Sequence, residues 1–195
     1  MSKELIISNI SHHIHLTPTE TEFLLSLLEL KTLTKKQFLL RLGEICRFDN
    51  FIIRGCVKVC YLDDKGTECI IKFAPENWWV VDLDSFLNSK PAFCYIQAIE
   101  ETEVYQLSRS NHDLLYKSIP QFQKFSNERW QNGFIALQQR IMQNLSLTAE
   151  ERYQHFIRKY PGLEQRIPQK LIASYLGITP EFLSMLRKKW ATQFS

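Results

Sequence analysis

The chain has 195 residues, of which 45% are hydrophobic and 12% are aromatic. This composition is typical of a packed globular protein and excludes a disordered chain. The net charge of +3 is small but unevenly distributed: residues 146–195 contain eight Lys or Arg and four Asp or Glu, whereas residues 1–145 carry a net charge of −1. The basic excess at the C-terminal end suits contact with nucleic acid.

Residues 1–10 lack the long apolar core and cleavage site of a secretory signal, and no stretch approaches about 18 consecutive apolar residues. We therefore expect a cytoplasmic protein with no membrane partner. The cysteines are odd in number and form no CxxC pair: Cys46, Cys56, Cys60, Cys69 and Cys94. We expect free thiols, no zinc and no iron–sulfur cluster, with Cys56 and Cys60 packed in a sheet.

The first predicted element is an amphipathic helix over Leu16–Leu30. Thr17 and Glu20 form a capping box at its start. Three histidines precede the helix, two of them with the HxH spacing of some metal sites: His12, His13 and His15. No second group of ligands completes such a site, so we favour a solvated turn and expect no metal.

Short β-strands are predicted between residues 35 and 107, where β-branched and aromatic residues recur between turns. The predicted segments are Phe38–Leu40, Phe51–Ile53, Cys56–Tyr61, Glu68–Phe73, Trp78–Val81, Tyr95–Ala98 and Val104–Leu107. Asp63–Gly66 is a candidate hairpin loop. Near-regular short strands indicate an antiparallel sandwich or barrel. A metal enzyme of the cupin type is not supported, because no histidine occurs between His15 and His112.

Residues 111–144 are predicted to be helical, with a short helix at His112–Lys117 and a new helix beginning at Pro120. Apolar residues then recur mostly at spacings of three or four, which predicts one apolar stripe along the long helix. The stripe contains Phe125, Trp130, Phe134, Leu137, Ile141 and Leu145. Its partner is either a second copy of this helix or the chain's own β-strands.

The C-terminal segment 169–189 has the pattern of a helix-turn-helix. A capping box at Thr148 begins the preceding helix, which runs to Tyr160. Gly177 ends the next helix in the conformation that a tight turn needs. Thr179 caps the second helix, whose Leu183 and Leu186 face the core. The alternative is an ordinary helical hairpin with a solvated charged face.

The outer face of this segment carries side chains suited to DNA. Hydroxyl groups contact phosphates or bases, a carboxylate accepts from the cytosine amino group, and basic residues bind phosphates or guanine edges. The candidate DNA-binding residues are Gln169, Thr179, Pro180, Glu181, Ser184, Arg187 and Lys188.

The segment resembles the helix-turn-helix of CRP-FNR family bacterial transcription regulators, and the rest of the chain resembles the same family. That resemblance implies an α+β fold with a β-roll of the double-stranded jelly-roll type (1–110), a dimerisation helix (111–145) and a helix-turn-helix, winged-helix-like domain (146–195). The family's recognition pattern of Arg-Glu and a later Arg falls on Pro180, Glu181 and Met185, so only the glutamate is retained. A different operator sequence is therefore expected.

The resemblance also implies a cyclic-nucleotide-binding-like pocket in the β-roll, but the phosphate-binding residues depart from the family. The glycine before the family glutamate is replaced by Pro75, which has no N–H to donate, and the segment expected to hold an arginine (90–95) has none. We therefore expect no tight binding of cyclic AMP, no cofactor and an unknown effector. Candidate ligand-binding residues are Glu76, Asn77, Trp78, Trp79 and Lys90.

These patterns predict a non-enzymatic, homodimeric, sequence-specific transcription regulator. Its expected partners are double-stranded DNA, a second copy of itself and RNA polymerase. The dimer interface implied by the resemblance contains Phe125, Trp130, Phe134, Leu137 and Ile141. The alternative is a ligand-binding or protein-interaction module whose helix-turn-helix no longer reads DNA.

Overall fold

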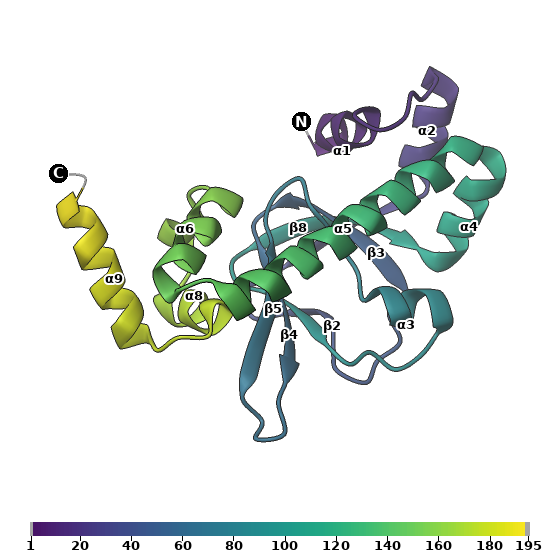
Figure 1. The fold of residues 1–195 in the computed structure, drawn as a ribbon. Helices are drawn as coiled ribbons and strands as arrows, with labels where there is room; N and C mark the ends of the chain where they lie inside the picture. The colour runs from purple at the N-terminus through teal and green to yellow at the C-terminus, as the bar shows by residue number, and fades with distance from the viewer. Residues whose placement is uncertain (1, 194–195) are drawn as a thin grey trace.

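The computed structural model describes residues 2–193. Two helices come first, a pair of four-stranded sheets follows, and a long helix then crosses the molecule toward the C-terminal helices (Figure 1). The helices are α1 (Ser2–Ser11), α2 (Pro18–Ser26), α3 (Leu83–Asn88), α4 (Arg109–Ser118), α5 (Pro120–Ser146), α6 (Ala149–Lys159), α7 (Leu163–Arg166), α8 (Gln169–Leu176) and α9 (Pro180–Gln193). The strands are β1 (Leu28–Leu33), β2 (Phe38–Leu40), β3 (Phe48–Arg54), β4 (Val57–Leu62), β5 (Glu68–Ala74), β6 (Trp79–Val80), β7 (Tyr95–Ala98) and β8 (Thr102–Ser108).

The strands form two antiparallel sheets in the orders β1-β8-β3-β6 and β2-β7-β4-β5. In the first sheet Phe51 pairs with Tyr105, and in the second Val59 pairs with Ile96. Side chains from both sheets meet in one buried cluster that includes Ile52, Val57, Ile96 and Val104. The predicted antiparallel β-roll is confirmed, and each of the seven predicted strand segments overlaps an observed strand.

The prediction of one helix over Leu16–Leu30 is wrong in its second half. The capping box is present, because Thr17 Oγ1 accepts from Glu20 N–H and the Glu20 carboxylate accepts from Thr17 N–H. The helix ends at Ser26, however, and Leu28–Leu33 form an edge strand paired with β8. Backbone pairing with β8 therefore outweighs the helical pattern of these leucines.

Helix α5 has 27 residues and two different environments. Its first turns lie against the β-roll and α1, where Phe122, Phe125 and Ser126 are buried. There Arg129 forms an ion pair with Asp49, a fully buried carboxylate on β3, and its guanidinium lies 4.6 Å from the centre of the Trp79 ring. The second half extends past the roll to the C-terminal helices (Figure 1).

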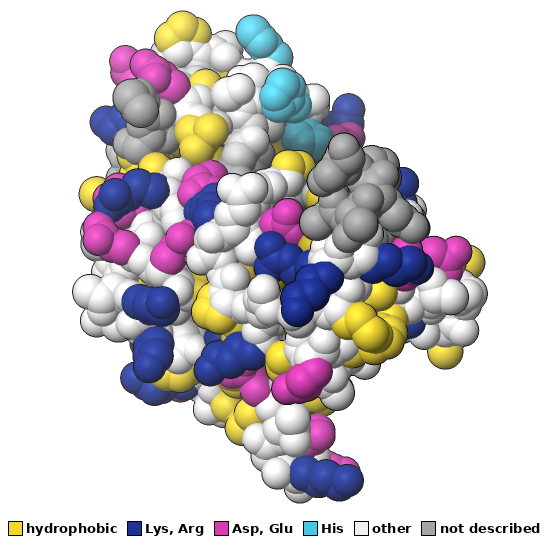
Figure 2. Space-filling model, turned by 90° about the vertical axis from the view of Figure 1, so that its left-hand side faces the viewer, with side chains coloured by type: hydrophobic (Ala, Val, Ile, Leu, Met, Phe, Trp, Pro, Cys, Tyr) yellow, Lys and Arg dark blue, Asp and Glu magenta, His cyan; other side chains and the backbone are white. Residues whose placement is uncertain are grey.

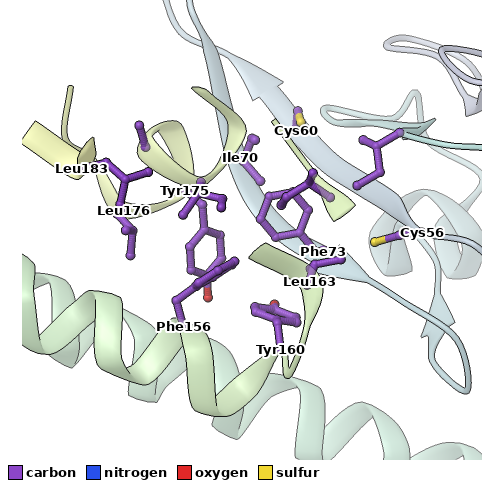
Figure 3. Close-up of a cluster of buried hydrophobic side chains, with 14 of the residues drawn as sticks. Cys56, Cys60, Ile70, Phe73, Phe156, Tyr160, Leu163, Tyr175, Leu176 and Leu183 are labelled. Carbon is purple, nitrogen blue, oxygen red and sulfur yellow. The ribbon is translucent and has the colours of Figure 1, made fainter. Parts of the chain in front are cut away.

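The C-terminal helices share a core with the β-roll instead of standing apart from it. Figure 3 shows Phe73 of β5 facing Phe156 of α6, Tyr160 directly after that helix, and Tyr175 of α8. The ring centres of Phe73 and these three residues are 5.5–6.2 Å apart. The cluster also contains the buried Cys56 and Cys60: Cys60 is in β4 of the second sheet as predicted, whereas Cys56 directly precedes that strand. The division into three domains remains a prediction, and this cluster joins the first to the third.

The predicted solvated turn around the histidines is wrong for His13. Its ring nitrogen lies 3.1 Å from the Glu128 carboxylate on α5, and its ring packs edge-on against Phe125. His12 and His15 are exposed. In the part of the chain that the structure describes, no group of three metal-ligating side chains comes together, and no helix there is long and apolar enough to cross a membrane.

Candidate nucleic-acid interface

Helices α8 and α9 are joined by a turn with well-defined hydrogen bonds. Gly177 has φ +67°, and the N–H of Ile178 donates to the carbonyl of Ala173 at 3.0 Å, which closes the end of α8. Thr179 Oγ1 accepts from the N–H of Phe182 at 3.2 Å and caps the start of α9. Leu183 is fully buried against α8, so the turn and this leucine fix the position of α9.

The candidate DNA-binding residues lie at or near the surface. Thr179, Pro180, Glu181 and Lys188 are exposed, as is Gln169 at the start of α8. Ser184 and Arg187 are partly buried. Figure 2 shows Lys and Arg side chains in several places on this face of the molecule, with acidic and apolar groups between them.

Two apolar side chains on α9 are also exposed, Phe182 at 39% and Met185 at 56%. Sequence reasoning did not single out Phe182, although its position directly before the core residue Leu183 placed it on the outer side of the helix. Further along α9, Lys189 is paired with Glu150 of α6 at 2.9 Å. The described surface of α9 therefore combines a carboxylate, hydroxyls, basic groups and two apolar side chains.

The second half of α5 carries an apolar stripe open to water. Phe134 is 62% exposed, Leu137 45%, Ile141 51% and Leu145 84%. Trp130 is partly buried at the start of this stripe. The structure does not bring Phe125 to it: this side chain is 1% exposed and packs against Trp79 and Phe122 within its own chain. Ile135 and Met142 are also exposed on this half of the helix.

The candidate effector residues do not converge on one pocket. The Trp78 ring packs at a tilt against Tyr160, directly after α6, with ring centres 5.6 Å apart. Trp79 packs in the cluster beneath α1 and donates its Nε1–H to Asn9 at 2.9 Å, and the Asn77 side chain is also bonded to Asn9. Lys90 follows α3 and is exposed, and its Nζ lies 3.6 Å from the carboxylate of Asp84 in that helix.

The carboxylate of Glu76 already has partners. It accepts from the backbone N–H of Gly55 at 2.8 Å and from both Nη atoms of Arg166 at 2.7 and 2.9 Å. Arg166 also reaches Glu100 at 2.5 Å. Burial acts to raise the pKa of Glu76, but the hydrogen bonds from Arg166 and Gly55 outweigh it and hold the pKa below its usual value. The glutamate that the resemblance assigned to ligand binding is thus paired with an arginine from the C-terminal segment.

Comparisons with known proteins match this architecture to solved structures at low sequence identity. No protein-family model matches the chain, and no curated protein matches it. The structure of the c-di-GMP responsive global regulator CLP from Xanthomonas campestris has a TM-score of 0.71 at 14% identity and covers 91% of this chain and 93% of its own.

Two further structures are similar over most of their length. FixK2 from Bradyrhizobium japonicum has a TM-score of 0.70 at 19% identity and covers 85% of each chain. A CRP/FNR family regulator from Eubacterium rectale has a TM-score of 0.69 at 15% identity and covers 91% of this chain and 85% of its own. The chain therefore has the fold of the CRP-FNR transcription regulators, as the sequence resemblance implies.

Proposed function

We propose that this protein is a homodimeric transcription regulator that binds specific DNA sequences through α9. The observation that carries the proposal is the helix-turn-helix itself: a hydrogen-bonded turn and the buried Leu183 hold α9 against α8, and residues in the first turn of α9 remain exposed. A helix held in this way can enter the major groove with its first residues against base edges.

The exposed residues suggest a division of roles. Glu181 is in the first turn and can accept a hydrogen bond from a cytosine amino group. Lys188 and Arg187 lie further along α9 and suit phosphate contacts, which position a protein without reading sequence. Pro180 and Met185 stand where the resembling family carries arginines, so these positions cannot form the bidentate guanine contact.

The exposed stripe on α5 suits a symmetric helix pair. Four large apolar side chains that are 45–84% exposed would be covered by the same four from a second copy. A symmetric dimer presents two α9 helices to two half-sites about 34 Å apart on one face of the duplex. We therefore expect a palindromic operator, and a DNA-bound regulator of this kind would act through contact with RNA polymerase.

The effector region supports a regulator that does not hold cyclic AMP through the usual phosphate contacts. Pro75 has no N–H to donate, and the Glu76 carboxylate is bonded to Arg166 and Gly55. A ligand would have to displace the Arg166 ion pair to reach this carboxylate. Cyclic AMP is therefore not the proposed effector.

A second candidate function is a protein-interaction module with the same fold. The observation that favours it is the exposure of Phe182 and Met185 on α9, because exposed apolar side chains of this size are common in protein interfaces. In this case α9 would contact a protein surface, and no DNA sequence would be preferred.

Selection from a pool of randomised DNA duplexes distinguishes the two candidates. The regulator proposal predicts enrichment of one palindrome with half-sites one helical turn apart. Glu181→Gln should change the preferred bases within that half-site. Arg187→Ala with Lys188→Ala should weaken binding to all sequences and reduce the slope of log K against log salt by about 2. No enrichment by the wild-type protein would favour the interaction module.

A further inference from the structure

A cleft is lined by side chains from the second half of α5 and from α6 and α8; Figure 1 shows where these three helices lie. Its volume is about 370 Å³, which is within the range of small-molecule sites. On α5 it is lined by Gln139, Arg140 and Gln143, among others. At 3.6 residues per turn these positions point roughly 140° away from the exposed apolar stripe. The cleft therefore stays accessible when the stripe is covered.

The charge of the cleft is one-sided. Five basic side chains line it and no carboxylate does: Arg140, Arg152, His155, Arg158 and Lys159. Within the described residues, none of these Lys and Arg side chains forms a salt bridge. Four uncompensated positive charges around a recess attract anions.

The cations differ in how their donors are used. Arg152 donates to the carbonyls of Leu147 and Leu176, at 2.7 and 3.3 Å, so most of its role is structural. Arg158 is exposed and has no hydrogen-bond partner within residues 2–193. It is therefore free to turn toward an anion in the cleft.

Arg140 has a donor without an acceptor. Its Nη2 donates to the carbonyls of Ile70 and Tyr175 at 2.9 Å, and its guanidinium lies 3.8 Å from the centre of the Tyr175 ring. Its Nη1 is shielded from water and has no partner in the described part of the chain. A buried donor left unpaired is costly, so an acceptor is missing at this position.

Lys159 is also partly buried. Burial lowers the pKa of its ammonium group, and the nearby Arg140 lowers it further. An anion between the two would remove this repulsion and supply the missing acceptor. The lining contains no carboxylate that could act as this anion.

We propose that this cleft binds a phosphorylated small molecule of about nucleotide size. Phosphate oxygens accept the forked N–H groups of arginine, and several phosphate charges can be shared among four cations. The ligand would contact α5 on one side and α6 and α8 on the other, and so would hold the C-terminal helices in this position. That regulatory consequence rests on the proposed function, whereas the binding itself does not.

Isothermal titration calorimetry of the full chain without DNA tests the site. The probes are inorganic pyrophosphate and ADP, with adenosine as the uncharged comparison. We expect pyrophosphate and ADP to bind one per chain with Kd below about 1 mM, and adenosine to give no binding heat. Arg158→Gln and Lys159→Met should each weaken binding by about fivefold or more, because both remove a positive charge and keep an unbranched side chain.

The matched control is Lys117→Gln, which removes an exposed charge at the end of α4. It should leave the affinity for pyrophosphate unchanged within about twofold. No binding heat up to about 5 mM pyrophosphate, or equal weakening by Lys117→Gln, would overturn the proposal. It would also be overturned if Arg158→Gln and Lys159→Met reduced the salt slope of DNA binding and left pyrophosphate binding unaltered, since these cations would then contact DNA phosphates.

Hydrogen exchange locates the ligand independently of affinity. Pyrophosphate should slow exchange of amides on α6 and α8, which line the cleft, and protection confined to α9 would contradict the assignment. Because neither measurement uses DNA, their failure leaves the proposed DNA binding intact. A protein that binds pyrophosphate but selects no DNA sequence would instead contradict only the proposed function.

Discussion

Replacement of Phe134 by alanine should weaken the proposed dimer strongly. A phenylalanine side chain offers about 200 Å² for burial, and Phe134 is 62% exposed, so about 120 Å² is available to a partner. At about 25 cal/mol per Å² this contributes about 3 kcal/mol per copy, or 6 kcal/mol in a symmetric pair. If only half of this area is buried, about 3 kcal/mol is lost, and the dimer Kd of the variant is about 100-fold higher than that of the wild type. Sedimentation equilibrium over a concentration series measures this Kd.

Phe93 provides a matched control for this experiment. It is 63% exposed but lies in the loop before β7, outside the stripe on α5. Phe93→Ala therefore removes the same side chain at the same exposure and should leave the dimer Kd unchanged. If Phe134→Ala changes the Kd by less than about threefold, or if both variants weaken the dimer equally, the stripe is not the interface.

Three predictions concern the stability of the single chain, measured by urea unfolding. Burial lowers the pKa of His112 from 6.5 to about 3, so below pH 6.5 the unfolded chain binds a proton that the folded chain does not. The free energy of unfolding should therefore fall by about 2 kcal/mol between pH 6.5 and 5. An equally steep loss in His112→Phe would refute this. Gly55→Ala should lower the free energy of unfolding by more than about 3 kcal/mol, because φ is +87° and a Cβ would lie 2.3 Å from a backbone carbonyl oxygen. In Gly133→Ala the new Cβ meets nothing within 4 Å, so this variant should gain up to about 1 kcal/mol of stability. Arg166→Ala should lower the free energy of unfolding by about 1 kcal/mol, since its ion pairs with two carboxylates are about one-third exposed. An unchanged stability would show that these ion pairs do not secure the C-terminal helices.

Features with local causes were predictable from sequence. The capping boxes at Thr17 and Thr148 and the turn at Gly177 each depend on side chains within four residues of one another. Strands were recognised where β-branched and aromatic residues were dense. The helix-turn-helix, with Leu183 and Leu186 buried, follows from the same short-range rules.

Features that depend on distant partners were not predictable. Strand β1 has the sequence LELKTL, which continues a helical pattern, and only its pairing with β8 makes it a strand. Phe125 and Phe134 are nine residues apart, which places them on opposite faces of α5, and only the face of Phe125 is covered by the β-roll and α1. Glu76 was assigned to a ligand because its partner, Arg166, lies 90 residues further along the chain.

Sequence-specific binding of DNA is the central claim, and fluorescence anisotropy tests it most directly. A duplex enriched by selection and an unrelated duplex of equal length would be titrated at two salt concentrations, with and without cyclic AMP. The account predicts binding of the selected duplex at least about 1,000-fold tighter than the unrelated one, with no dependence on cyclic AMP. Equal affinity for both duplexes would contradict the DNA-reading role, and binding that requires cyclic AMP would contradict the interpretation of Pro75 and Glu76.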